Sequence, residues 1–266
     1  MNAPDTPPSF DLPPPEFQAA LKALHRLAQR DEDDVPGRIL EMTATTLDVA
    51  RASLWSLTPG RRAIRCRRMF ERTSGMHDPD IELPCDAAPA YFHAIEGLLV
   101  LAAEDAQRDP RTIELAASYL EPLGIGAILD VPVCEFGEIV GVLCLEHVGS
   151  VRRWTGAERL FVASLSGILS QRHDRLRMAA AEDERRHQLL FDAATGLAGR
   201  SLFVDRLAHA VSELPEGHDL AVLALDLERL RSLAHRYGGD FANSVMAESA
   251  ARIGQLVPSA RTGRIA

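Results

Sequence analysis

The stretch AILDVPVCEFGEIVGVLCLEHV, residues 127–148, contains two apolar runs with β-branched side chains, joined by a short segment that includes Gly137. Such runs are typical of strands, and a glycine between them favours a tight turn. The stretch therefore predicts an antiparallel hairpin. A second hairpin is predicted upstream, from RASLWSL at 51–57, the turn TPGR at 58–61 and AIRCRRMFER at 63–72. Together the two hairpins predict an antiparallel sheet.

Two amphipathic helices are predicted before the first hairpin, separated by the charged turn DEDD and Pro36. The first begins near Glu16, and both have apolar residues at helical spacing. We expect the two helices to pack on the same apolar surface. These apolar residues are Phe17, Leu21, Leu24 and Leu27 in the first helix and Ile39, Leu40, Met42 and Leu47 in the second.

The segment between the hairpins predicts further helical structure. Residues 82–97 favour a helix in their second half, and residues 109–124 have the outline of a complete helix. In the latter, Asp109 can cap the N-terminus, Pro110 occupies the first helical position and Gly124 follows the end.

Residues 155–191 predict one long closing helix, with Thr155 as N-cap and Glu158 completing a capping box. Its first half is apolar, whereas its second half is mostly charged, with a sparse stripe of Leu176, Leu189 and Leu190. Two interpretations stay open for the second half: a solvated connector, or a parallel two-helix coil that joins two protomers. The second makes a homodimer through this helix the expected assembly.

Composition excludes several classes of protein. The 266 residues carry a formal net charge of −9, which argues against general binding to nucleic acid or anionic membranes. The four cysteines form no Cys-x-x-Cys pair, so neither a zinc site nor a disulfide framework is expected. No apolar run has the length of a membrane helix, and residues 1–15 are predicted to be a disordered, proline-rich leader. A cytoplasmic protein is the expectation.

Residues 105–133, DAQRDPRTIELAASYLEPLGIGAILDVPV, and 136–158, FGEIVGVLCLEHVGSVRRWTGAE, resemble a GAF domain. The resemblance covers roughly residues 16–172. It implies an α+β fold, an antiparallel sheet flanked by helices, and a pocket beneath the excursion between the hairpins. It also implies a sensor of a small molecule or a protein partner rather than a catalyst.

Four polar residues fall where GAF domains enclose their ligands: Asp105, Arg111, Tyr119 and Asp130. They are the candidates for lining a pocket that binds an unidentified small molecule. For Arg111 an equal alternative is an ion pair with Glu114 at the start of a helix.

Glu146 and His147 suggest general acid/base chemistry, but neighbours on a strand point to opposite faces, so a structural role is favoured. Cys85, Cys134 and Cys144 raise the possibility of a covalently attached bilin. The Cys-His dipeptide of bilin-binding relatives is absent from the sequence, and no cavity is evident for a haem at His147. Neither cofactor is expected.

A second resemblance begins at FDAATGLAGRSLFVDRL, residues 191–207, which is similar to the entry of a GGDEF (diguanylate cyclase type) domain. The family's Asp-x-Leu-Thr-Gly-Leu-x-Asn-Arg pattern is met by five residues and departs at Ala194 and Gly199. Residues 220–253 resemble the family's first core strand, metal-binding turn and second helix. The matching residues of the entry pattern are Asp192, Thr195, Gly196, Leu197 and Arg200.

The second resemblance implies particular site residues. Asp226 stands where the family has a metal-binding carboxylate, and Arg231 where it has a lysine near the phosphates; hard cations such as Mg²⁺ take carboxylate ligands. The guanine-reading Asn and Asp of the family fall at Ala234 and Asn243. An alanine cannot hydrogen-bond a base edge, so poor guanine recognition is expected.

Residues 260–266, ARTGRIA, resemble the approach to the signature hairpin that carries the family's catalytic carboxylate. The resemblance implies that this hairpin is missing, so that the chain as given is not a competent cyclase. Either the chain is a fragment of a longer protein, continuing for example to a phosphodiesterase domain, or the segment is vestigial. Mg²⁺ is expected only with the full domain.

The leading hypothesis is a regulatory module of cyclic-di-GMP signalling. It has a GAF domain at 16–172, a connecting helix at 173–190 and a partial, degenerate GGDEF-like α/β segment at 191–266. Two alternatives stay open: an enzyme of cyclic-di-GMP turnover in full-length form, or a GAF dimerisation platform whose pocket is filled by its own side chains.

Overall fold

The computed structural model of the chain describes residues 13–32, 34–228, 230–256 and 262–264. It contains two compact units, residues 1–176 and 177–266. The predicted disorder of the leader falls on residues 1–12, which lie outside the described residues; Pro15, assigned to that leader, is already the first residue of a helix.

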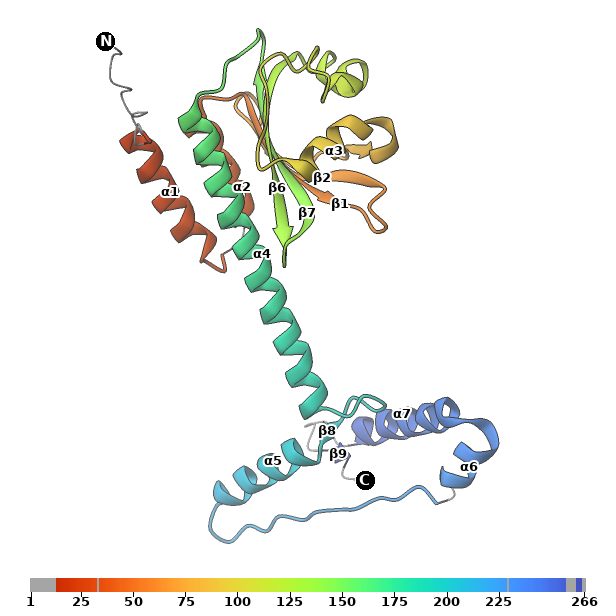
Figure 1. Cartoon of the computed structure of the whole chain (residues 1–266). Coiled ribbons are helices and arrows are strands. Elements are labelled where there is room, and N and C mark those ends of the chain that lie inside the picture. Colours follow the sequence, from red (N-terminus) through yellow and green to blue (C-terminus); the bar gives the residue numbers. More distant parts are fainter. Residues whose placement is uncertain (1–12, 33, 229, 257–261, 265–266) are drawn as a thin grey trace, which may run out of the picture. The chain divides into compact units, whose positions relative to one another are not determined.

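An antiparallel sheet forms the centre of the first unit (Figure 1). Its strands lie in the order β3-β2-β1-β7-β6-β5, with β4 also paired to β2. Both predicted hairpins are confirmed. The bounds are β1 Arg51–Leu57, β2 Ala63–Glu71, β3 Gly75–His77, β4 Glu82–Pro84, β5 Leu101–Ala103, β6 Ile125–Glu135 and β7 Glu138–Val148.

The turn between β6 and β7 consists of Phe136 and Gly137, because Glu135 pairs with Glu138. Both residues have positive φ, 49° and 87°. A two-residue turn of this handedness matches the twist of the flanking strands. Gly137 serves this turn as predicted, and Phe136 takes the same left-handed conformation with its side chain exposed.

Three helices cover one face of the sheet, called the helix face below (Figure 1). They are α1 Pro15–Ala28, α2 Val35–Leu47 and the first part of α4 Gly156–Leu190. Alternate residues of β6 and β7 point into this core, among them Leu129, Val131 and Leu145, and the predicted apolar faces of α1 and α2 meet them. A capping box starts α4 as predicted: Glu158 N donates to Thr155 Oγ1 (3.1 Å), and Thr155 N donates to Glu158 Oε2 (2.7 Å).

The opposite face, called the pocket face, is covered by α3 Pro89–Gly97 and by short helical turns. The regular helix predicted over 109–124 is wrong. A 3₁₀ turn at Ile113–Leu115 is followed by a π turn at Ala116–Leu120. The cause lies at Thr112, which is fully buried, has non-helical backbone angles and donates its hydroxyl to Ala106 O at 2.6 Å. This tertiary bond overrides the local helix signals.

The second unit contains α5 Arg200–Ser212, α6 Leu230–Tyr237 and α7 Gly239–Leu256. Two short strands, β8 Ala198–Gly199 and β9 Gly263–Arg264, pair in parallel. Asp192 organises the entry: its carboxylate accepts from Thr195 N (2.9 Å) and from Arg264 Nη1 (3.0 Å).

The core strand predicted near residues 220–227 is not formed, since this segment has no regular secondary structure. Leu223 and Leu225 are 88% and 76% exposed. A strand is stabilised by neighbours on its ladder, and none of the described residues pairs with this segment. Among the described residues, no helix is long and apolar enough to cross a membrane.

Candidate functional site

Two carboxylates lie on the pocket face of the central hairpin. Asp130 on β6 pairs in register with Cys144 on β7, and Glu146 lies two residues further along β7. Side chains two apart on a strand share a face, so both carboxylates point away from the helix face. Each residue is only 2% exposed.

Two tyrosines from the covering segments donate to these carboxylates. Tyr91 on α3 donates its hydroxyl to Asp130 Oδ2 at 2.7 Å, and Tyr119 in the π turn donates to Glu146 Oε1 at 2.7 Å. Both tyrosines are buried, and the ring of Tyr119 packs edge-on against Trp55 of β1. We call Asp130, Glu146, Tyr91 and Tyr119 the carboxylate–tyrosine cluster.

The cluster leaves several buried polar atoms unsatisfied. Asp130 Oδ1 and Glu146 Oε2 have no hydrogen-bond partner among the described residues, nor does Arg51 Nη1. A buried polar atom without a partner is costly, and in native proteins it calls for an explanation such as a ligand.

Burial controls the electrostatics of the cluster. It raises the pKa of Asp130 to about 7, a shift that the hydrogen bond from Tyr91 opposes and the negative charge of Glu146 reinforces. Burial also raises the pKa of Glu146, against the hydrogen bond from Tyr119 and the attraction of Arg51. A carboxyl group that titrates near neutrality in an enclosed site is typical of functional sites.

The two carboxylates differ in their cationic neighbours. Arg51 Nη1 lies 3.7 Å from Glu146 Oε2, while Arg51 Nε contacts Glu71 Oε1 at 2.6 Å. Asp130 makes no ion pair with any described residue. The ionised form of Asp130 is therefore stabilised by hydrogen bonds, from Tyr91, Cys144 and the Leu145 backbone, and not by a cation.

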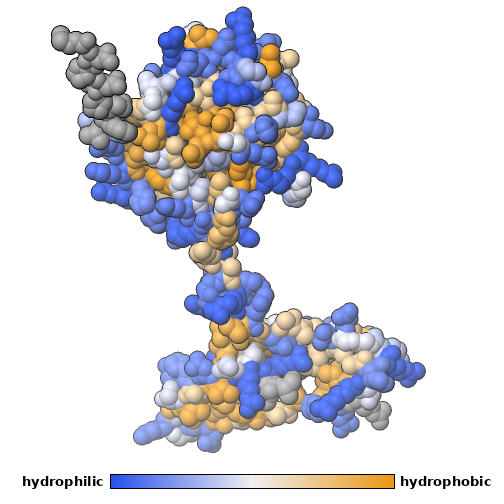
Figure 2. Space-filling view, viewed as in Figure 1, coloured by the Kyte–Doolittle hydropathy of each residue, from blue (hydrophilic) through white to orange (hydrophobic). Residues whose placement is uncertain are grey.

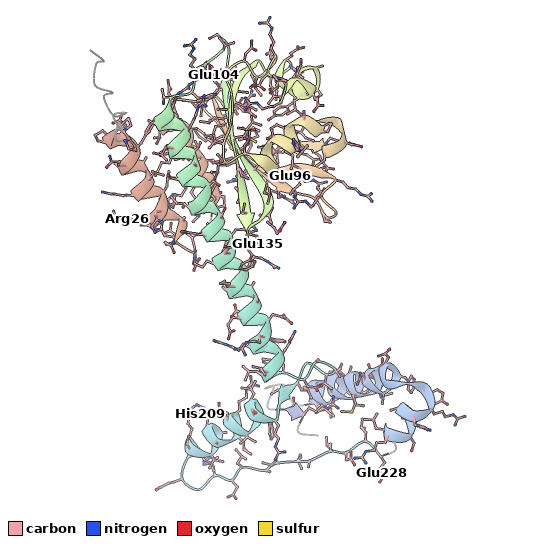
Figure 3. All side chains as sticks on the ribbon, in the orientation of Figure 1. Arg26, Glu96, Glu104, Glu135, His209 and Glu228 are labelled. Carbon is pink, nitrogen blue, oxygen red and sulfur yellow. The ribbon has the colours of Figure 1, made fainter. Side chains whose placement is uncertain are left out.

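A small cavity of about 90 Å³ lies elsewhere on the pocket face, and none of the four cluster residues lines it. Arg61 and Glu96 line the cavity and form an ion pair of 3.4 Å. Both side chains are largely exposed, so they stand where the cavity meets the surface. Glu96 is seen at the end of α3 in Figure 3. The other lining residues are mostly apolar: Leu57, Ile64, Cys85, Phe92, Ile95, Ile139 and Val142.

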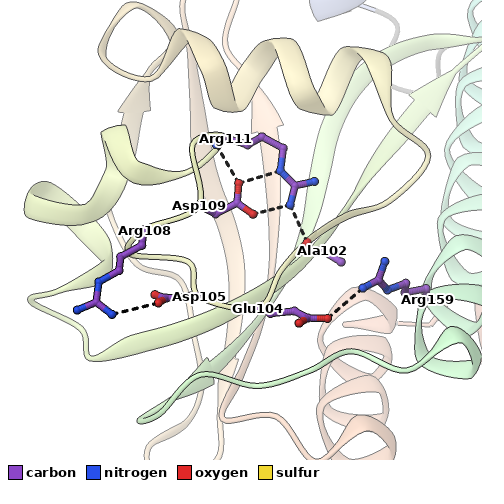
Figure 4. A pocket seen from close by; sticks show the side chains of 7 residues that line it. All are labelled: Ala102, Glu104, Asp105, Arg108, Asp109, Arg111 and Arg159. Carbon is purple, nitrogen blue, oxygen red and sulfur yellow. Dashed lines mark hydrogen bonds and ion pairs between the residues drawn. The ribbon is translucent and has the colours of Figure 1, made fainter.

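A polar surface hollow of about 480 Å³ lies elsewhere, beside the edge strand β5 (Figure 4). Three acidic and three basic side chains line it as three ion pairs: Arg111 with Asp109 (2.5 Å), Arg108 with Asp105 (3.4 Å) and Arg159 with Glu104 (3.3 Å). Its charges are thus compensated within the protein.

The alternative ion pair between Arg111 and Glu114 is wrong. Arg111 binds Asp109 through two nitrogens and donates to Ala102 O at 2.8 Å. Glu114 instead accepts from Ala90 N at 2.8 Å, at the start of α3. The cause is again the irregular backbone of residues 109–120, which does not follow the helical spacing that the pair requires.

The structure divides the four candidate pocket residues between two places. Asp105 and Arg111 line the surface hollow, whereas Tyr119 and Asp130 belong to the interior cluster. Sequence reasoning missed Glu146 as a pocket residue, although it correctly expected Glu146 and His147 to face opposite sides. The available signal was the alternation of β7, which places Glu146 on the same face as Asp130 of the paired strand.

The cysteines considered for cofactor attachment lie in different environments. Cys144 is buried against Tyr91, with 3.7 Å between sulfur and hydroxyl oxygen, and burial raises the pKa of its thiol. Cys85 and Cys134 are half-buried, and burial raises the pKa of each thiol. A raised pKa disfavours the nucleophilic thiolate.

The residues that the GGDEF resemblance implies for nucleotide and metal binding lie in the second unit. Asp226 is exposed in the segment without secondary structure, and Arg231 is exposed on α6. Ala234 lies on α6 and Asn243 on α7. Within the part of the chain that the structure describes, no three His, Cys, Asp or Glu side chains form a metal-binding group.

Comparison with known proteins identifies both segments. The model of the GAF domain matches residues 31–172, more than half of the chain. The chain belongs to the GAF domain family. The model described as "Diguanylate cyclase, GGDEF domain" matches residues 189–263. A GAF domain followed by a GGDEF segment is the composition of a cyclic-di-GMP signalling module, as predicted from the sequence.

Solved structures show the same fold. The phycocyanobilin-bound GAF domain of a cyanobacterial phytochrome is 14% identical, with a TM-score of 0.52, covering 61% of this chain and 96% of that one. A phycoerythrobilin-bound GAF domain of a cyanobacterial phytochrome is 13% identical, with a TM-score of 0.51, covering 62% and 97%. At this identity the likeness establishes the fold alone. No curated protein matches the chain.

Proposed function

We propose that this protein is a regulatory module in which the GAF domain binds a small molecule at the carboxylate–tyrosine cluster and passes the signal through α4 to the GGDEF segment. The observation that carries the proposal is the position of β6. Asp130 of this strand belongs to the cluster, while the next residue, Val131, is buried in the core that α4 shares. One strand thus contacts both the site and the closing helix.

Polar contacts strengthen the link between β6 and α4. Ser166 donates its hydroxyl to Pro132 O at 2.5 Å, and Ser170 Oγ accepts from Cys134 N at 2.9 Å. At the following turn, Asp174 Oδ1 accepts from Phe136 N at 2.8 Å. A displacement of β6 by a ligand therefore changes the contacts of α4 over two turns. Coupling of this kind requires that the ligand bind more tightly to one arrangement than to the other.

The second half of α4 supports a dimer through this helix. Within the predicted stripe, Leu176 and Leu189 are 42% and 68% exposed, and Leu190 is half-buried. Figure 2 shows apolar and hydrophilic stretches alternating along the helix. We propose that residues 173–190 form a parallel coil with a second copy, between a GAF domain at 16–172 and a GGDEF-like segment at 191–266.

Disulfide crosslinking tests the coil. Single cysteines introduced at positions 176 and 189 of the full chain are expected to give intersubunit products under mild oxidation. Val204→Cys on α5, a position that is 52% exposed, is the matched control and is expected to give none. Absence of product at every α4 position would contradict the coil.

We also propose that the GGDEF segment acts as a regulatory output without guanine-specific catalysis. The support is chemical: Ala234 offers no hydrogen bond to a base edge, and Asn243 replaces the family's acidic group. Asp226 and Arg231 remain the proposed positions for metal and phosphate. Incubation with Mg²⁺ and GTP is expected to give no cyclic dinucleotide; its accumulation would favour the turnover enzyme instead.

A further inference from the structure

We propose that the GAF domain takes a small organic cation, whose protonated amine pairs with Asp130 and whose apolar group occupies the cavity lined by Phe92 and Val142. This inference deepens the proposed function and rests on it for the location of the site. It specifies the chemical class of the ligand, which neither the fold nor its similarity to other domains supplies.

The charge of the site selects a cation. Glu146 has Arg51 within 3.7 Å, but Asp130, 2% exposed, makes no ion pair with any described residue. Burial of a carboxylate without a cationic partner costs several kcal/mol or forces the group to remain protonated. An anionic ligand would add to this cost, whereas an ammonium group would remove it.

The hydrogen-bonding atoms select a donor. Tyr91 and Tyr119 each already donate to one carboxylate oxygen. Asp130 Oδ1 and Glu146 Oε2 have no hydrogen-bond partner among the described residues, although Arg51 Nη1 lies 3.7 Å from Glu146 Oε2, and both oxygens are acceptors when ionised. An ammonium group has three donors and no acceptor, so it matches what remains. A neutral alcohol has a single donor and no charge.

The apolar part of the ligand is selected by the cavity. Val142 lines it and lies two residues from Cys144, the register partner of Asp130. Two residues along a strand correspond to about 7 Å. Phe92 lines the same cavity, and its ring packs edge-on against Tyr91 with centroids 5.3 Å apart. Residues of α3 thus border both the cavity and the carboxylate, and the proposed ligand spans the distance between them.

Three probes of matched shape test the class of ligand on the full chain. They are 3-methylbutylamine, 3-methylbutan-1-ol and 3-methylbutanoate, which are cationic, neutral and anionic near pH 8. Each is titrated against the protein while thermal unfolding of the first unit is followed, because a ligand that binds only the folded state raises Tm. The amine alone is expected to raise Tm in a concentration-dependent manner. Equal shifts by all three probes, or a shift by the anion, would overturn the proposal.

Two variants locate the amine. Asp130→Asn keeps the shape of the side chain and an acceptor for Tyr91 but removes the charge, so the affinity for the amine is expected to fall at least about tenfold. Asp105→Asn, in the separate surface hollow, is the matched control and is expected to bind as the wild type does. Retention of affinity in Asp130→Asn would overturn the assignment.

A measurement on the wild type covers the case in which Asp130→Asn does not fold. The free carboxyl titrates at about 7, and the amine pairs with its ionised form. The affinity is therefore expected to rise about tenfold between pH 6 and pH 8, while the amine stays protonated. The titratable groups that face Asp130 are Tyr91 from α3 and Cys144 and Glu146 from β7, and the backbone of Leu145 also hydrogen-bonds to it. An affinity that does not change with pH would contradict pairing with Asp130.

Failure of this inference is distinguishable from failure of the proposed function. If the amine binds but leaves crosslinking of α4 unchanged, the ligand class stands and coupling to α4 is contradicted. If no amine binds while crosslinking of α4 shows the coil, the ligand class is contradicted and the regulatory proposal needs another ligand.

Discussion

The two faces of the central hairpin are built from the same strands but differ in the side chains that they bury. On the helix face, β6 and β7 present Leu129, Val131 and Leu145 to three helices, and this core is apolar. On the pocket face, the alternate positions include Asp130 and Glu146, buried beneath short and irregular segments. The difference indicates that one face stabilises the domain, while the other gives up some stability, which we propose serves recognition of a ligand.

The largest expected effect comes from the helix face. Leu145 is fully buried there, and Leu145→Ala is expected to lower the free energy of unfolding by about 3 kcal/mol, through lost transfer energy and the cavity left behind. Urea denaturation followed by tryptophan fluorescence measures it, since both tryptophans, Trp55 and Trp154, lie in the first unit. Leu160→Ala, at a position 53% exposed on α4, is the control, with an expected change within about 0.5 kcal/mol. Equal effects of the two variants would contradict the assignment of the core.

On the pocket face, removal of a buried charged side chain is expected to raise the free energy of unfolding, not to lower it. The pKa of Asp130 is about 7 in the folded protein, against 3.8 as the ordinary value. The folded state therefore binds more protons between these values, so stability falls as pH rises from about 4 to 7. Above pH 7 the cost approaches a value on the order of 4 kcal/mol as an upper bound.

Asp130→Asn removes this cost. The variant is expected to be more stable than the wild type at pH 8 by about 2 kcal/mol and to differ little from it at pH 4. Urea denaturation at the two pH values measures the difference, and Asp105→Asn is the control with no such pH dependence. A loss of stability at pH 8 would show that the ionised carboxylate is already compensated.

A smaller effect on the free energy of unfolding is expected at the start of α4, the last of the three helices that cover the helix face. Thr155→Ala removes the hydroxyl that accepts from Glu158 N, and a lost N-cap costs about 1 kcal/mol. Thr155→Ser keeps this acceptor and is expected to retain most of the stability. If both variants were equally destabilised, packing of the Thr155 methyl group rather than capping would be responsible.

Local patterns were sufficient to predict the helix face. The alternation in residues 127–148, the apolar spacing of the first two helices and the capping box all act within a few residues, and the structure confirms them. The pocket face depends on longer-range contacts. The turn at Thr112 is decided by a bond to Ala106 O, and the importance of Glu146 emerges only when β6 and the π turn bring Asp130 and Tyr119 beside it.

The second unit shows the same limit. Its helix α7 forms where the second resemblance implies a helix, but the strand implied at 220–227 needs partners that none of the described residues supplies. Asp192 and Arg264, 72 residues apart in sequence, meet only in the folded unit.

The central claim is that occupation of the pocket face changes the contacts of α4 through β6. The most direct test measures intersubunit crosslinking of Leu176→Cys and Leu189→Cys in the full chain. Each cysteine variant is made with Asp130 and with Asp130→Asn, and each is measured with and without saturating 3-methylbutylamine. The account predicts that the amine changes the yield at these positions only when Asp130 is present. Binding of the amine, shown by its effect on Tm, with identical crosslinking in all four cases would contradict it.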